Sequence, residues 1–437
     1  MLKKVIGWLL VICAGCSMLM AQDQFVRVNQ GQFWRNGTPY VFMGVNFWYG
    51  MNLGSNGEGG DQDRLRRELD RLQAMGIRNL RLMAASEGPP EAPWGLQPTL
   101  QPQAGLLDEE LLVGLDVLLA EMGRRNMTGV LCLNNFWPWS GGMAQYVYWA
   151  SGDPIPYPPP AEGGDWARYQ LYASRFYQDT VAQGYFREVV KALVERRNTI
   201  IGQLYKDDPV IMAWQLANEP RGILHPRAYR RWIKETAALI KSMDSRHLVS
   251  IGSEGATPSR LAGTRFKKDH RIPGIDYATC HIWVQNWGWF DPEKGLADVP
   301  PALEKAVAYL EKHRKQARRM GIPLVLEEFG ISRDGNDHSA QSALTVRDAY
   351  FQAIFDRVGE GIAAGDMAGC NIWAWGGEGR PRVPKAIWRA GDDFIGDPPH
   401  EYQGWYSVFD TDTSTQKIMK AAASQFAGRS KDVSNPK

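Results

Sequence analysis

The chain has 437 residues, and its 50 lysines and arginines nearly balance 48 aspartates and glutamates. A chain with so little net charge has no excess of positive charge with which to attract nucleic acids or anionic membranes. Its 44% hydrophobic residues and mean hydropathy of −0.36 exclude both a membrane bundle and a disordered chain. The chain holds 17 Trp, 16 Tyr and 15 Phe, and because neutral sugars stack on aromatic faces, a carbohydrate partner fits this composition.

Residues 1–21 have the pattern of a secretory signal peptide. Two lysines precede an apolar run, residues 5–20, and Ala21 is a small residue at the expected cleavage site. We therefore expect a secreted or periplasmic protein. Cys16 ends an Ala-Gly-Cys string that resembles a lipoprotein attachment site, but a cysteine replaces the aliphatic residue expected three positions earlier, so simple cleavage is preferred. Residues 22–437 show no linker and no repeat, which predicts a single domain without a membrane span, acting as a monomer.

Strands and helices alternate regularly after this segment. Residues 25–40 alternate in polarity and turn at Asn36-Gly37, which predicts a β-hairpin. Eight apolar strands are then predicted at 41–47, 77–83, 127–134, 210–217, 248–252, 275–281, 324–328 and 368–373. Amphipathic patterns predict helices at 63–75, 108–122, 185–204, 226–243, 302–320, 344–358 and 415–426.

This series predicts an α/β protein, a (β/α)8 TIM barrel with a short N-terminal β-hairpin and enlarged βα loops. The strands are apolar throughout, as is typical of parallel strands covered by helices. A doubly wound sheet is the alternative, but no G-x-G-x-x-G string opens a helix after a strand. Two rim loops are unusually aromatic, residues 136–178 and the stretch around 287–290, and we expect part of them to stack on sugars.

Cysteine and histidine placement favours neither a disulfide framework nor a metal centre. Cys132, Cys280 and Cys370 fall on predicted strands, which indicates buried free thiols. The seven histidines form no ligand-spaced pair. We therefore expect no metal and no cofactor, although a structural Ca²⁺ stays open.

Polar residues gather where the predicted strands end, and two carboxylates stand out among them. Glu219 follows the fourth strand of the barrel and Glu328 follows the seventh. A barrel brings all carboxyl ends of its strands to one rim, which is where active sites form. Two carboxyls that converge there suit glycosidic cleavage, in which one protonates the leaving oxygen and the other attacks the anomeric carbon or activates water.

The strings around these residues resemble the two catalytic signatures of glycoside hydrolase family 5, Asn218-Glu219-Pro220 and Glu328-Phe329-Gly330. The resemblance extends over nearly the whole mature chain. Within the family, the sequence is most similar to the endo-β-1,4-mannanase group, on the strings Asn134-Asn135, Gly252-Ser253-Glu254-Gly255 and Asn371-Ile372-Trp373-Ala374-Trp375. The resemblance implies Glu219 as general acid/base and Glu328 as nucleophile of a retaining enzyme. It implies a substrate-binding site formed by Arg81, Asn134, Asn135, Asn218, Glu254, His281, Trp283, Trp373 and Trp375.

The implied roles make physical sense. Glu219 must start protonated near neutral pH, which burial and the charge of Glu328 favour. Arg81 is the expected cation that keeps Glu328 ionised, and Asn218 is expected to hydrogen-bond the 2-hydroxyl of the sugar at the cleavage point. Strand pleating should send Glu327 to the opposite face from Glu328.

One departure from the family pattern concerns the second residue after His281. The family commonly has His-x-Tyr there, and the tyrosine donates a hydrogen bond to the nucleophile. This chain has His281-Ile282-Trp283. An indole N–H can also donate, but it reaches differently, so Glu328 could be held by other groups.

The expected activity is therefore hydrolysis of internal β-1,4-mannosidic bonds of mannan, glucomannan or galactomannan, with β-mannan as the polymeric partner. A family 5 endo-β-1,4-glucanase is the nearest alternative, because only the loops and the surroundings of the 2-hydroxyl would differ. A non-catalytic carbohydrate-binding barrel is disfavoured by the presence of both carboxylates. Whether cleavage is internal or terminal depends on loop closure at one end of the cleft, which the sequence leaves open.

Overall fold

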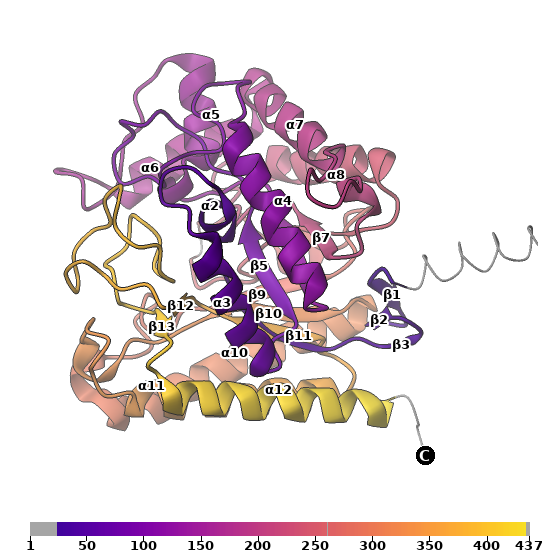
Figure 1. The fold of residues 1–437 in the computed structure, drawn as a ribbon, viewed down its shortest axis with the longest axis vertical. Coiled ribbons are helices and arrows are strands. Elements are labelled where there is room, and N and C mark those ends of the chain that lie inside the picture. The colour runs from indigo at the N-terminus through magenta and orange to yellow at the C-terminus, as the bar shows by residue number, and fades with distance from the viewer. Residues whose placement is uncertain (1–23, 260, 434–437) are drawn as a thin grey trace, which may run out of the picture.

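Eight parallel strands form the centre of the fold (Figure 1), in the order β8-β7-β6-β5-β4-β11-β10-β9. The computed structural model describes residues 24–259 and 261–433, so the expected signal peptide and Cys16 lie outside the described residues. The barrel strands are β4 (Phe42–Asn46), β5 (Asn79–Met83), β6 (Thr128–Cys132), β7 (Ile211–Gln215), β8 (Leu248–Ser250), β9 (Ala278–Ile282), β10 (Leu324–Phe329) and β11 (Gly369–Ile372). Every residue of these strands is buried, as expected for strands covered on both faces.

The two end strands of this order, β8 and β9, almost close the barrel. The backbone N–H of Asp276 donates to the carbonyl of Val249 at 2.9 Å, and that of His281 donates to the carbonyl of Glu254 at 3.0 Å. The predicted (β/α)8 barrel is thereby confirmed.

Helices surround the barrel on its outside (Figure 1), namely α3 (Gln62–Ala74), α4 (Glu109–Arg124), α7 (Thr180–Val194), α8 (Pro226–Met243), α10 (Val299–Met320), α11 (Thr345–Ala363) and α12 (Thr413–Val433). Three of them, α3, α4 and α7, begin at an aspartate cap, and Asp108, for example, accepts from the backbone N–H of Leu111 at 3.1 Å. No helix in the described parts of the chain is both long and apolar enough to cross a membrane.

The helix predicted at 185–204 is wrong in extent. Asp179 caps the start of α7 by accepting from two backbone N–H groups, so the helix begins earlier and ends at Val194. After it, the side chain of Asn198 accepts from the backbone of Ile200 and Ile201. These local bonds form a turn that competes with helix formation.

The N-terminal hairpin covers the end of the barrel at which the strands begin. Strands β1 (Arg27–Asn29), β2 (Gln32–Arg35) and β3 (Thr38–Pro39) form a small antiparallel sheet, with the predicted turn at Asn36-Gly37 and a further turn before β2. Phe33 packs edge-on against Tyr277 inside the barrel end, with ring centroids 5.2 Å apart. The larger cavity opens at the opposite rim, which the carboxyl ends of the strands form.

The remaining short elements lie mainly in the βα loops of that rim. The helices are α2 (Gly50–Gly54), α5 (Gly142–Ser151), α6 (Trp166–Ala173) and α9 (Phe266–Asp269), and the paired strands are β12 (Trp375–Gly377) and β13 (Val408–Phe409). Short 3₁₀ turns lie at Pro138–Ser140, Ser174–Tyr177, Tyr205–Asp207, Pro292–Asp298 and Asp334–Asn336. The enlarged loops are thus partly helical, whereas the sequence analysis predicted a loop at 136–178. Cys132, Cys280 and Cys370 are buried free thiols as predicted.

Candidate active site

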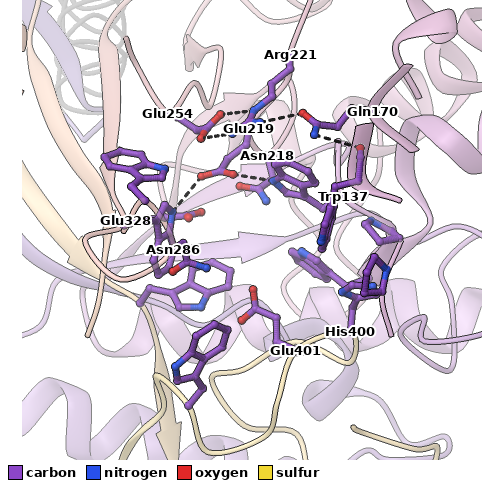
Figure 2. A pocket seen from close by; sticks show the side chains of 18 of the residues that line it. Trp137, Gln170, Asn218, Glu219, Arg221, Glu254, Asn286, Glu328, His400 and Glu401 are labelled. Atoms are coloured by element: carbon purple, nitrogen blue, oxygen red, sulfur yellow. Dashed lines mark hydrogen bonds and ion pairs between the residues drawn. The ribbon is translucent and has the colours of Figure 1, made fainter. Parts of the chain in front are cut away.

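A cavity of about 560 Å³ opens at the carboxyl ends of the strands (Figure 2). Of the site residues predicted from the sequence, six line it, namely Asn218, Glu219, Glu254, Trp283, Glu328 and Trp373. Arg81, Asn134, Asn135 and His281 are buried behind its wall and reach the lining residues through hydrogen bonds. Ten of the residues predicted from the sequence therefore lie in the wall of this cavity or directly behind it.

Three donors hold the carboxyl group of Glu219. His281 Nδ1 lies 2.6 Å and Trp283 Nε1 lies 3.2 Å from Oε1, and Trp137 Nε1 lies 2.7 Å from Oε2. The backbone of Glu219 has φ +49°, a strained value for a residue other than glycine. Its N–H donates to the carbonyl of Gly252 at 2.9 Å, which helps to hold this conformation just beyond β7.

Glu328, near the end of β10, is held mainly by a cation. Arg81 Nη1 donates to Glu328 Oε1, and His281 Nδ1 lies 3.2 Å from Oε2. The same guanidinium donates to Asn46 Oδ1 at 3.0 Å and to Asn218 Oδ1 at 2.8 Å. Although burial alone would lower the pKa of Arg81, the charges of Glu328 and Glu327 hold it above its usual value. Arg81 is therefore a fixed cation beside the Glu328 carboxylate.

His281 lies between the two predicted catalytic carboxylates. Burial disfavours its charged form, but the charge of Glu328 and hydrogen bonds to Glu219 and Glu327 raise the pKa of His281 well above its usual value. A protonated imidazole donates from both nitrogens. His281 thus supplies positive charge to both carboxylates at once.

The prediction that Glu327 faces away from Glu328 is wrong. The register of β10 against β9 shifts between Leu326 and Glu328, a β-bulge that interrupts the alternation of side chains. Glu327 is consequently buried in the same cluster, where Gln215 Nε2 donates to both of its oxygens at 2.8 Å. Burial raises its pKa, but the charge of Arg81, the hydrogen bond and charge of His281 and the hydrogen bond from Gln215 together hold the pKa of Glu327 below its usual value.

Three asparagines form a chain of hydrogen bonds at the wall of the cavity. Asn218 Nδ2 donates to Asn135 Oδ1 at 3.1 Å, and the backbone N–H of Asn135 donates to Asn134 Oδ1 at 2.7 Å. Asn134 and Asn135 are fully buried and do not line the cavity. Asn218 does line it, so the structure gives Asn218 direct access to a ligand and its two neighbours a supporting position.

Glu254 is paired rather than free. It accepts two bonds from Arg221, both at 2.7 Å, and Figure 2 shows this pair beside Glu219. Burial raises the pKa of Glu254, the charge of Arg221 opposes this, and the charge of Glu219 adds to it, leaving the pKa above its usual value. A ligand hydroxyl in this part of the cavity would meet the ion pair and not an isolated carboxylate.

Trp283 donates to the acid/base candidate and not to the nucleophile candidate. Its indole N–H contacts Glu219 Oε1, whereas Glu328 is held by Arg81 and His281. Trp283 also packs edge-on against Trp373, with ring centroids 5.8 Å apart. Trp373 is 4% exposed, and its Nε1 lacks a protein partner among the described residues. Both tryptophans therefore present part of an indole ring to the cavity.

The structure places Trp375 away from the cavity, contrary to the role predicted for it. Its side chain is fully buried in β12, and its Nε1 donates to Glu68 Oε2 on α3 at 3.0 Å. Trp375 is absent from the cavity lining. The pairing of β12 with β13 directs this tryptophan toward α3, so its role is to satisfy a buried carboxylate.

A Trp375→Phe substitution tests this corrected role. Glu68 would lose a donor while staying buried, so we expect the free energy of unfolding to fall by about 1–3 kcal/mol, as measured by chemical denaturation. KM for a manno-oligosaccharide should not change. Trp373→Phe is the matched control, and it should alter turnover or KM because Trp373 lines the cavity. A raised KM in Trp375→Phe with unchanged stability would contradict the structural role.

Several lining residues were missed by the sequence analysis, notably Arg221, Asn286, His400 and Glu401. Glu401 Oε2 is buried without a hydrogen-bond partner among the described residues. Burial, together with the charges of Asp397, Glu328 and Glu219, raises the pKa of Glu401 well above its usual value. Among these residues, Arg221 alone had a local sequence signal, because it stands two positions after Glu219. Trp137, which also lines the cavity, stands in the aromatic loop that was expected to stack on sugars.

Glu219, His281 and Glu328 also bring three possible metal-ligand atoms within 4.8 Å of one another. Ligation requires a neutral imidazole. The raised pKa of His281 favours the protonated ring instead.

Comparison with known proteins gives a consistent picture. A family model described as GH family 5 beta-mannosidase-like matches residues 23–430. Mannan endo-1,4-beta-mannosidase 5 of Solanum lycopersicum is 31% identical over 370 residues, which is 81% of each chain. Mannan endo-1,4-beta-mannosidase 8 of Oryza sativa subsp. japonica is 30% identical over 369 residues, 78% of this chain and 88% of its own.

Solved structures agree with these relatives. A glycoside hydrolase family 5 mannosidase from Rhizomucor miehei is 39% identical, with a TM-score of 0.87 over 94% of this chain and 99% of its own. A mutant of that mannosidase was solved in complex with mannosyl-fructose, and it matches at 38% identity and a TM-score of 0.88 over 95% of this chain and all of its own.

Proposed function

The chain belongs to the GH family 5 beta-mannosidase-like family, and on this basis we propose that it hydrolyses β-1,4-mannosidic bonds of mannan, glucomannan or galactomannan with retention of configuration. One observation carries the stereochemical part of the proposal. A carboxylate oxygen of Glu219 and one of Glu328 lie within 4.8 Å of each other. Retaining glycosidases place their two carboxyl groups roughly 5–5.5 Å apart, while inverting ones need about 6.5–9.5 Å to admit a water molecule.

The proposed reaction assigns one step to each carboxyl. Glu219 protonates the leaving glycosidic oxygen while Glu328 attacks the anomeric carbon, which breaks the glycosidic bond and forms a mannosyl ester on Glu328. Glu219, now ionised, takes a proton from water as the water attacks the ester and releases the sugar. Arg81 and His281 place positive charge beside the attacking oxygens of Glu328.

A second candidate, release of sugars from a chain end, is favoured by a contact between two rim loops. Trp166 on α6 packs edge-on against His400 in the loop between β12 and β13, with ring centroids 5.4 Å apart. The side chain of His400 also hydrogen-bonds the backbone of Pro159. Figure 2 places His400 and Glu401 across the cavity from Glu254. A cavity closed on one side would hold the end of a chain more readily than its middle.

Two assays test the proposal. We expect hydrolysis of glucomannan or galactomannan to exceed that of carboxymethylcellulose, and ¹H NMR should show the β-anomer of the product first. Higher turnover on carboxymethylcellulose would favour the glucanase alternative, and an α-anomer appearing first would exclude retention. The early products from mannohexaose separate the two modes of cleavage, because chain-end release gives one short product while internal cleavage gives several intermediate lengths.

We also propose that residues 1–21 direct export, so that the enzyme meets polysaccharide outside the cytoplasm. The basic and apolar pattern of the segment supports this. N-terminal sequencing of the exported protein would show a start at Gln22, whereas an intact Met1 on cytoplasmic protein would contradict it.

A further inference from the structure

Arg221 lies in the wall of the cavity, where it is held from several sides. Its Nε and Nη2 each donate to Glu254 at 2.7 Å, and its Nη1 donates to Gln170 Oε1 at 2.9 Å. Gln170 in turn donates to the backbone carbonyl of Trp166 on the same helix, α6. A guanidinium that is fixed at all three nitrogens has a defined plane, which a flexible surface arginine lacks.

The plane of Arg221 covers one face of Trp137. The guanidinium carbon lies 4.8 Å from the centroid of the Trp137 ring, within the range of a cation–π contact. The ring of Trp166 packs against Trp137 edge-on, with centroids 5.6 Å apart and an interplanar angle of 82°. At the base of the side chain, the Trp137 backbone N–H donates to Asn135 Oδ1 at 3.0 Å. These contacts leave the indole little freedom to turn.

The edge of this fixed ring contacts the acid/base candidate. Trp137 Nε1 donates to Glu219 Oε2 at 2.7 Å, while Oε1 accepts from His281 and Trp283. An indole nitrogen is a donor only. Its position therefore determines where Oε2 lies and also stabilises the ionised form of the carboxyl group, which the second step of the proposed reaction requires.

We propose that Arg221 is a positioning residue for Glu219 that acts through Trp137: the guanidinium holds the indole ring, and the ring holds the carboxyl group. This inference rests on the proposed function, because it takes Glu219 to be the general acid/base. It differs from a role in which Arg221 contacts the leaving sugar directly. It also assigns a purpose to the Glu254–Arg221 pair, since Glu254 sets the plane of the guanidinium.

The first test compares two leaving groups in Arg221→Met. Mannobiose needs a proton from Glu219 to depart, whereas 2,4-dinitrophenolate departs unaided. We expect kcat/KM to fall roughly 10- to 100-fold for mannobiose and less than about threefold for 2,4-dinitrophenyl β-mannoside. Arg314→Met is the matched control, because Arg314 and Asp366 form a similarly buried pair, with side chains 10% and 4% exposed against 10% and 3% for Arg221 and Glu254. It should leave both activities unchanged.

The second test asks whether Arg221 and Trp137 act as one unit. Trp137→Phe keeps a ring but removes the N–H, and it should show the same dependence on the leaving group. Residues that act through one another give non-additive effects, so the double variant should lose little more activity than Trp137→Phe alone. Effects that multiply in the double variant would overturn the proposal.

A third test separates position from charge. Arg221→Lys keeps the positive charge but loses the flat fork that stacks on the indole. Trp137→Phe removes the hydrogen bond to the carboxylate, and Arg221→Lys loosens it by freeing the indole, so both should move the alkaline limb of the kcat/KM profile for mannobiose to higher pH. An unmoved limb in Arg221→Lys, with wild-type activity, would mean that charge alone matters and would overturn the proposal.

Failure of this inference can be told apart from failure of the proposed function. If Glu219 is the acid, Glu219→Gln must itself lose far more activity on mannobiose than on the dinitrophenyl substrate. If that selectivity is absent in Glu219→Gln, the proposed function is wrong. If it is present there but absent in Arg221→Met, only the positioning role is wrong.

Discussion

Glu328→Ala is expected to reduce hydrolysis of manno-oligosaccharides by about 10⁴-fold or more, because the covalent route loses its nucleophile. The fold should persist, since the smaller side chain leaves Arg81 bonded to Asn46, Asn218 and Gln215. Azide is small enough to enter the vacated space. With an activated aryl β-mannoside and azide, the variant should therefore form α-mannosyl azide, which ¹H NMR identifies.

The neighbouring carboxylate provides a matched comparison for that variant. Glu327→Gln keeps the size of the side chain, and Glu327 contacts Gln215 in the interior and does not line the cavity. It should retain far more activity than Glu328→Gln and yield no mannosyl azide. If Glu327→Gln instead gave the larger loss and the azide product, the assignment of the nucleophile on β10 would be wrong by one residue.

Glu219→Ala is expected to show the opposite stereochemistry of rescue. Loss of the general acid should lower kcat/KM for mannobiose by about 10²–10⁴-fold, while an activated aryl mannoside still forms the ester on Glu328. Azide can then attack that ester in place of activated water, and the product should be β-mannosyl azide. The measurement is again NMR of the azide product, together with the rate as a function of azide concentration.

The two azide products identify the two roles independently of the size of either rate loss. A β-azide from Glu219→Ala with an α-azide from Glu328→Ala means that the carboxyls lie on opposite faces of the sugar. The same anomer from both variants would contradict the proposed double displacement. Neither outcome depends on which polysaccharide the enzyme prefers.

The main features of the barrel could be predicted from the sequence because they depend on local patterns. Each strand is an apolar run with polar residues at its carboxyl end, and Glu219 and Glu328 stand at two such ends. The predicted strands overlap the observed ones in all eight cases. Parallel packing then brings the strand ends together without any further information.

Features that depend on contacts between distant segments could not be predicted in this way. Nothing in the string Leu326-Glu327-Glu328 signals a bulge, which arises where β10 pairs with β9. Trp373 and Trp375 look equivalent in Trp-Ala-Trp, but β12 pairs with β13, and Trp375 is satisfied by Glu68 more than 300 positions away.

The residues that the rim loops contribute to the cavity could not be predicted either, because they depend on contacts between distant segments. The wall residues His400 and Glu401 follow no strand directly, and His400 meets Trp166 on α6 because two long loops touch. The predicted sugar-binding aromatics of residues 136–178 divided in the structure. Trp137 and Trp166 line the cavity, while Tyr146 is fully buried and donates to Glu87.

The bulge in β10 also determines the balance of charges in the buried cluster around Arg81 and His281. Because Glu327 and Glu328 both face inward, three carboxyl groups, with Glu219, share two cations, Arg81 and the protonated His281. A regular strand would have left two carboxyls for the same two cations. The bulge therefore sets three carboxyls against two cations inside the barrel, so a substitution that removes Arg81 would leave His281 as the single cation among them.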